Sequence, residues 1–234
     1  MRFLQFNIQH ARNFLSGKID LDALADAIAL LGADFVCLNE VYGEGPAASF
    51  TDQVGYLARK LGFYGYFAPA IQIEGAGPYG NAFLSRFPVE AARTVPVPTV
   101  PRNHPGYFED RCAFQALLRV GEKKIKVIGI HFGLQPEEQA AAAETICALL
   151  DADDLPVILS GDFNVEPGDP VLAPIRARAC DTATLPGGEA PTYPSDKPQI
   201  KIDYIFTRGL TAQSVCVPEM IVSDHLPVLA EIDI

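Results

Sequence analysis

The feature that most constrains the fold is a series of short apolar runs that each end in polar side chains. Their length and the turn residues that bound them are typical of buried strands. The runs are Arg2–Phe6 before Asn7, Phe35–Leu38 before Asn39 and Glu40, Ile125–Ile130 before His131, and Val157–Ser160 before Asp162 and Asn164. Side chains at strand ends project from a rigid scaffold into a common crevice, where α/β proteins usually place their sites.

Helical segments alternate with these strands. Apolar residues recur at helical spacing over Leu21–Leu31, with Asp20 as N-cap and Gly32 suited to end the helix. Further helices are expected over Ser49–Leu61, Pro136–Leu150 and Pro170–Arg178, and further strands over Phe63–Ala70, Gly80–Ser85, Ala91–Val97, Arg111–Val120, Ile202–Thr207, Ala212–Val217 and Val228–Ile232. The mixture predicts one α/β (α+β) domain over residues 1–234, with two sheets inside and helices outside.

Composition limits the partners and the compartment. The net charge of -11 repels the phosphate backbone of nucleic acid, which makes such a partner possible but disfavoured. The N-terminus lacks the apolar core of a signal peptide, and no stretch is long enough to cross a bilayer, so we expect a cytoplasmic protein with no transmembrane segment. The five cysteines form no metal-binding pattern and are expected to be buried, reduced thiols. Nothing in the sequence implies an obligate protein partner.

Each polar residue alone has an ordinary explanation. A glutamate after a strand is usually solvated, and a histidine there is usually only hydrogen-bonded. Asp162 and Asn164 would share one face if their strand continued through both, although Asx residues also favour turns. Together, however, the set combines hard oxygen ligands suited to Mg²⁺ or Mn²⁺ with histidine donors. That combination favours phosphoester chemistry.

Seven blocks carry a resemblance that covers nearly the whole chain. They are Phe6-Asn7, Leu38-Asn-Glu40, Gly80-Asn-Ala-Phe-Leu-Ser85, Ile130-His131, Ser160-Gly-Asp-Phe-Asn164, Ile202-Asp-Tyr-Ile-Phe206 and Ser223-Asp-His225. In this order, they resemble the endonuclease/exonuclease/phosphatase superfamily. The resemblance implies a four-layer α/β sandwich with two mixed sheets, and an enzyme that hydrolyses phosphoesters with Mg²⁺ or Mn²⁺.

The resemblance also implies roles for single residues. Glu40 is expected to be the principal metal ligand, with Asn7 near the metal and the phosphate and Asp224 near the metal. Asp162 would orient or deprotonate the attacking water, and Asn164 would hold that water or a phosphate oxygen. His131 would donate to a non-bridging oxygen, and His225 would face the phosphate with Asp203 accepting its other ring proton. Whether His225 is a base or a charge stabiliser is left open.

The substrate is less constrained. Eight of the 18 basic residues lie between Arg86 and Lys126, and most are expected to be solvated. The loop 101–111 is the better candidate for substrate contact, through Arg102, His104, Tyr107 and Arg111, together with Asn81 from the Gly80–Ser85 block. The segment Gly75–Gly80 is either a flexible rim of the site or an ordinary turn.

Three functions remain from the sequence. The first is a hydrolase of a small or lipid-like phosphoester, most simply a phosphodiester. The second is an endo- or exonuclease of DNA or RNA. The third is a non-catalytic module that binds a phosphorylated ligand, which is disfavoured because Glu40, Asp162, His131 and His225 are all present.

Overall fold

The computed structural model describes residues 1–234 and consists of two six-stranded sheets packed face to face. The first sheet has the order β11-β12-β1-β2-β4-β3 and the second the order β5-β6-β7-β8-β10-β9. The strands of the first sheet are β1 (Arg2–Asn7), β2 (Phe35–Tyr42), β3 (Tyr64–Ile73), β4 (Gly77–Ser85), β11 (Thr211–Cys216) and β12 (Val228–Asp233). Those of the second sheet are β5 (Val89–Pro96), β6 (Cys112–Val120), β7 (Lys123–His131), β8 (Val157–Asp162), β9 (Cys180–Asp181) and β10 (Asp203–Arg208).

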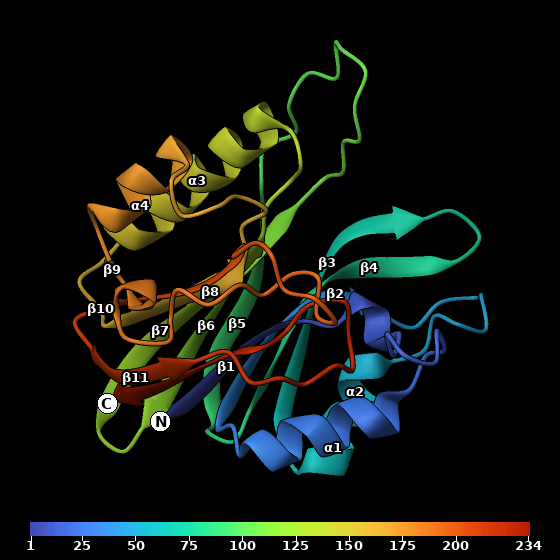
Figure 1. Ribbon diagram of the computed structural model, residues 1–234, viewed down its shortest axis with the longest axis horizontal. Helices are drawn as coiled ribbons and strands as arrows, with labels where there is room; N and C mark the ends of the chain where they lie inside the picture. The colour runs from blue at the N-terminus through green and yellow to red at the C-terminus, as the bar shows by residue number, and fades with distance from the viewer.

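Helices cover the outer face of each sheet. The helices α1 (Leu21–Leu31) and α2 (Gln53–Leu61) lie on one side of the molecule, and α3 (Pro136–Asp151) and α4 (Ala173–Arg176) lie on the other (Figure 1). Short 3-10 turns occur at Gln9–Ala11, Pro170–Leu172 and Thr182–Thr184. The expected four-layer α/β sandwich is therefore confirmed.

Three apolar clusters explain why these layers hold together. One joins α1 and α2 to the first sheet, through residues such as Ile28, Leu57 and Leu84. A second joins α3 to the second sheet, and the third fills the space between the two sheets. Each sheet buries both faces, which accounts for the nearly continuous apolar runs of its central strands.

Local signals fix the helix ends. The side chain of Asp20 accepts a hydrogen bond from the Ala23 N–H at 2.9 Å, and Gly32 ends α1 in the left-handed conformation at φ +62°. The helix expected from Ser49 begins later, at Gln53, because Asp52 caps it by accepting from the Gly55 N–H at 2.8 Å. The expectation for residues 49–52 was therefore wrong.

Two other expectations also need correction. Gly75–Gly80 is not a flexible loop, because β4 begins at Gly77 and pairs with β3, although Tyr79 of this segment does line a pocket. All five cysteines are free, and Cys37 and Cys112 are buried as expected. Cys180 and Cys216 are exposed instead, since they lie on the edge strands β9 and β11.

The two chain ends lie close together (Figure 1), where the Met1 amino group donates to the Ile232 carbonyl at 2.7 Å. None of the helices combines the length and apolar character needed to cross a membrane.

Candidate active site

Strand directions bring the polar strand ends to one edge of the sandwich. The strands β1 and β2 are parallel, as are β7 and β8, so their carboxyl ends lie on the same side of each sheet. His131 pairs in register with Asp162, and Asp162 with Asp203 at the start of the antiparallel β10. The segment that contains Asp224 and His225 precedes β12, which runs antiparallel to β1 and so starts near Asn7. The sandwich thus gathers polar residues from both sheets.

Glu40 reaches this edge through an irregular backbone. The pairing of β2 with β4 shifts between Leu38 and Val41, and Glu40 adopts the left-handed conformation at φ +59°. A glutamate there is strained, and such strain persists only where the surrounding structure enforces it. The carboxylate of Glu40 accepts a hydrogen bond from Asn7 Nδ2 at 3.0 Å, and Asn7 Nδ2 also lies 3.0 Å from Asp162 Oδ2.

A buried row joins Asp203, His225 and Asp162. Nδ1 of His225 lies 2.8 Å from Asp203 Oδ2, and its Nε2 lies 3.6 Å from Asp162 Oδ2. Burial opposes the charge on His225, but the carboxylates of Asp203 and Asp162 outweigh it and raise the pKa of His225 to about 10. Burial and the neighbouring Asp203 raise the pKa of Asp162 to about 7. His225 is therefore a cation at neutral pH, and the row favours charge stabilisation over base catalysis by this histidine.

His131 and Asn164 form the neighbouring part of the site. Nε2 of His131 lies 3.1 Å from Asn164 Nδ2, and its Nδ1 lies 3.2 Å from Arg111 Nη1. Burial and the Arg111 charge lower the pKa of His131 well below its usual range, so its ring is neutral. The pleat does not bring Asn164 beside Asp162, because β8 ends at Asp162 and Asn164 takes a left-handed turn at φ +51°.

The donor set fits a divalent cation. The carboxylates of Glu40 and Asp224 are close enough for the charge of Glu40 to affect the pKa of Asp224. Their hydrogen-bond donors, Asn7 and Ser223, are neutral and add no positive charge to offset the two carboxylates. Burial and the charge of Glu40 raise the pKa of Asp224. A hard cation bound by these oxygen atoms would relieve that repulsion. A second group of potential ligand atoms, all within 4.8 Å of one another, comes from Asp162, Asp203 and His225. In this group, Nδ1 of His225 is already hydrogen-bonded to Asp203.

These residues open into a pocket of about 430 Å³. The expected site residues that line it are Glu40, Tyr107, Arg111, His131, Asp162, Asn164, Asp224 and His225. Asn7 and Asp203 lie directly behind that lining, because each hydrogen-bonds to a lining residue.

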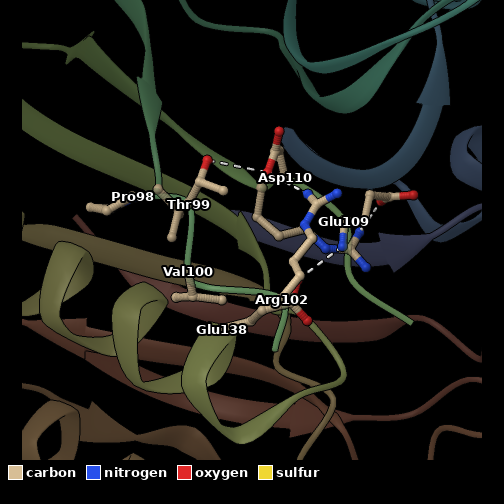
Figure 2. A pocket seen from close by; sticks show the side chains of 9 residues that line it. Pro98, Thr99, Val100, Arg102, Glu109, Asp110 and Glu138 are labelled. Carbon is tan, nitrogen blue, oxygen red and sulfur yellow. Dashed lines mark hydrogen bonds and ion pairs between the residues drawn. The ribbon is translucent and has the colours of Figure 1, made fainter. Parts of the chain in front are cut away.

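Three expected substrate contacts lie elsewhere. Arg102 is exposed and pairs with Asp110 at 2.8 Å beside a separate small cavity (Figure 2). His104 is exposed and lies 3.4 Å from Glu137 on α3. Asn81 is buried, where its amide donates to the Cys112 carbonyl at 2.7 Å and accepts from Asn39 at 2.8 Å. Asn81 thus belongs to a polar network between the sheets and not to the pocket.

Sequence reasoning did not single out Tyr79, Glu109 or Tyr193, although all three line the pocket. Burial and the neighbouring Glu40 raise the pKa of Tyr79 far above its usual range. The Tyr193 ring packs against His225 with centroids 4.9 Å apart. An aromatic residue before a proline or in a strand carries no distinctive signal. The sequence therefore indicated only the segments that contain Tyr79 and Glu109, 75–80 and 101–111, and gave no indication of Tyr193.

Comparison with known proteins places the chain in a family. The model of the Endonuclease/Exonuclease/phosphatase family matches residues 4–225, so the chain belongs to this family of phosphoester hydrolases. An uncharacterized protein of Escherichia coli K12, YbhP, is 28% identical over 99% of this chain and 95% of its own length.

Two solved structures show the same fold. A family member from Beutenbergia cavernae has a TM-score of 0.84 at 23% identity, over 100% of this chain and 71% of that one. The mannosyl-6-phosphatase of Bacteroides thetaiotaomicron has a TM-score of 0.80 at 16% identity, over 100% of both chains. At these identities the likeness concerns the fold alone.

Proposed function

We propose that this protein is a divalent-metal-dependent phosphodiesterase that acts on a small or lipid-like substrate by in-line attack of water. The observation that carries the proposal is the row Asp203–His225–Asp162, which lies beside the carboxylates of Glu40 and Asp224 in one pocket. Phosphoester hydrolysis needs a base for water, positive charge for the phosphoryl oxygens and a way to offset the phosphate charge. This pocket contains a candidate for each.

Asp162 is the candidate base. Its Oδ2 accepts from Asn7 Nδ2 at 3.0 Å and its Oδ1 from the Asn164 N–H at 2.9 Å, so the carboxylate is held in one orientation. A carboxylate fixed in this way can orient a water molecule and accept its proton as the oxygen attacks phosphorus. Asn7 and Asn164 are then positioning residues for the base as well as groups near the phosphate.

His225 and His131 are the candidate stabilisers of developing charge. The His225 cation is oriented by Asp203, so its Nε2–H can interact with a phosphoryl oxygen. His131, at the end of β7, can donate a second hydrogen bond to a non-bridging oxygen. Preorganised donors of this kind supply a large share of catalysis in buried sites.

Glu40, Asn7 and Asp224 are the residues that would hold the cation. Mg²⁺ or Mn²⁺ bound there would offset the charge of the phosphate and of the leaving oxygen. The oxygen-only donor set of these three side chains favours such hard cations over zinc.

The pocket chemistry supports a substrate with one phosphate and an apolar or aromatic substituent. Its single arginine, Arg111, already pairs with Glu109 at 2.6 Å. The remaining walls include Leu134, Ile200 and Ile202 as well as tyrosine rings. A nucleic acid needs several free cations for successive phosphates, which this lining lacks.

A substrate panel with Mg²⁺ and with Mn²⁺ tests the proposal. Bis-p-nitrophenyl phosphate should be hydrolysed faster than p-nitrophenyl phosphate, nicked or abasic DNA and RNA, and EDTA should abolish the activity. Turnover of the preferred substrate should vary only slightly with salt, because one phosphate is bound. A steep fall with salt and a preference for DNA or RNA would instead identify a nuclease. Absence of turnover on every ester would identify a binding module.

A further inference from the structure

The contact between Arg111 and His131 determines which ring nitrogen of His131 carries the proton. Nη1 of Arg111 lies 3.2 Å from Nδ1 of His131, and the Arg111 side chain is only 8% exposed. A guanidinium group has N–H donors and no acceptor. Nδ1 of His131 can therefore form this hydrogen bond only as an acceptor, without a proton.

The other ring nitrogen also faces a donor. Nε2 of His131 lies 3.1 Å from Nδ2 of Asn164. The orientation of the Asn164 amide is fixed, because Nδ2 also donates to the Phe132 carbonyl at 3.0 Å and a carbonyl can only accept. A neutral imidazole has one acceptor nitrogen, so only one of the two donors can be satisfied.

The charged donor prevails over the neutral one. Hydrogen bonds from a charged donor are roughly twice as strong as neutral ones. The opposite tautomer would direct an Nδ1–H at the Arg111 cation, which is unfavourable. The Nε2–H tautomer instead directs its proton towards the Asn164 amide, and Nε2 lies 3.6 Å from Asp162 Oδ2. The proton on Nε2 is left without a well-placed acceptor inside the protein.

We propose that Arg111 is a positioning residue that holds His131 as the neutral Nε2–H tautomer, so that its proton points into the pocket. A phosphoryl oxygen of the substrate is the acceptor that this N–H lacks. The use of the proton rests on the phosphodiesterase function proposed above, but the tautomer itself does not. Arg111 therefore acts on the substrate through His131 and not as a free phosphate ligand.

The surroundings of Arg111 hold its guanidinium in place. Glu109 pairs with Nη1 at 2.6 Å, accepts from the Tyr107 hydroxyl at 2.6 Å, and donates its backbone N–H to Glu138 at 2.9 Å. Arg111 also lines the cavity of Figure 2, which measures only about 10 Å³ and has no room for a substrate group. Substrate can thus approach the Arg111–His131 pair only from the pocket.

The Nε atom of Arg111 is in an unfavourable environment. It is the only buried side-chain nitrogen or oxygen of the protein without a hydrogen-bond partner. An unpaired buried donor costs about 1–3 kcal/mol. The fold keeps this unfavourable donor while placing Nη1 between Glu109 and His131, which is expected where the position of Nη1 serves a function.

Long-range ¹H–¹⁵N spectra of the histidine rings test the proposal without substrate or metal. The protein has four histidines, and the signals of His131 are assigned as those absent from the His131→Asn variant. In the wild-type protein we expect Nε2 of His131 to show the shift of a protonated nitrogen and Nδ1 that of an unprotonated one. A protonated Nδ1 would overturn the proposal, even if no Arg111 variant folds.

Two substitutions separate positioning from mere packing. Arg111→Met removes the donor to Nδ1 and leaves Asn164 as the donor that faces the ring, so it should shift His131 towards the Nδ1–H tautomer. Arg111→Lys keeps a cationic donor and should retain the Nε2–H tautomer. An Arg111→Met spectrum identical to the wild-type spectrum would also overturn the proposal. Near-ultraviolet circular dichroism checks that each variant is folded.

Kinetics with bis-p-nitrophenyl phosphate then test the consequence. In Arg111→Met we expect kcat to fall about tenfold or more while KM changes by less than about threefold, because a lost transition-state donor lowers kcat. A raised KM with unchanged kcat would show that Arg111 binds substrate directly, against the proposal. If wild-type protein turns over no ester, the proposed function fails while the spectra still decide the tautomer.

Discussion

Nδ1 of His225 lies 2.8 Å from Oδ2 of Asp203, and both side chains are buried. This pair joins the loop before β12 in one sheet to the first residue of β10 in the other. The carboxylate fixes the ring and supports its positive charge. The active-site geometry therefore depends on how the two sheets are docked, and not on either sheet alone.

Replacement of Asp203 should remove that support. In Asp203→Asn we expect kcat for a phosphodiester to fall by about 10² or more, because His225 loses the neighbouring negative charge that supports its own positive charge. His225→Ala should lower kcat on a similar scale. The control is Asp196→Asn, which changes an exposed aspartate outside the pocket and should leave kcat unchanged. Full activity in Asp203→Asn would contradict the role of the pair.

Much of this site could be predicted from strand ends. His131, Asp162 and Glu40 follow apolar runs, and parallel strands place their carboxyl ends together. Whether each of these side chains can act as a ligand, a base or a donor depends on its residue type, which can be read from the sequence. Their gathering at one edge follows from the α/β alternation that the sequence also shows.

The remaining features depend on tertiary packing. Glu40 and Asn164 adopt a left-handed backbone conformation that glycine usually occupies, so their residue types do not predict it. The neighbouring structure imposes this conformation. The polar network of Asn39 and Asn81 exists because the sheets face each other, which no local pattern encodes. The loop 101–111 contributes Tyr107 and Arg111 to the pocket but turns Arg102 and His104 away from it, since the loop pairs its charges with Asp110 and Glu137.

Metal binding should depend on Glu40. We expect Glu40→Gln to raise the Mg²⁺ or Mn²⁺ concentration for half-maximal activity by about tenfold or more, because a neutral amide replaces the carboxylate ligand. Calorimetric titration with Mn²⁺ measures the same loss without substrate. The matched control is Glu44→Gln, an exposed glutamate four positions away, which should behave as wild type. Equal metal affinity in wild type and Glu40→Gln would refute the assignment of Glu40.

The end of α3 provides a prediction about stability. Lys126 is buried, with Nζ 2.9 Å from both the Leu149 carbonyl and Asp153 Oδ2, and Arg208 donates to the Leu150 carbonyl. These cations replace a glycine cap and oppose the negative end of the helix dipole. Lys126→Met should lower the free energy of unfolding by about 1–3 kcal/mol, measured in urea, since it leaves a buried acceptor unpaired. Lys124→Met, on the exposed part of the same strand, should change it by less than about 0.5 kcal/mol.

The same ion pair should give a pH dependence. Partial burial raises the pKa of Asp153, but the hydrogen bonds from Lys126 and the Leu155 N–H outweigh it and hold the pKa below its ordinary value of 3.8. A carboxyl whose pKa is lowered by folding stabilises the protein above its ordinary pKa, and this contribution is lost as the pH falls through the folded value. The stability advantage of wild type over Asp153→Asn should therefore be constant at neutral pH and vanish in acid. A constant difference down to the acid transition would contradict this.

In the proposed reaction, Asp162 activates water for attack on a phosphodiester. The most direct test is kcat for bis-p-nitrophenyl phosphate with saturating Mg²⁺, compared between wild type and Asp162→Asn. We expect activity in the wild type that EDTA abolishes, and a loss of about 10² or more in kcat in the variant, the usual scale for a lost general base. Wild-type activity that survives EDTA, or a variant that retains full kcat, would rule out a metal-dependent reaction with Asp162 as the base.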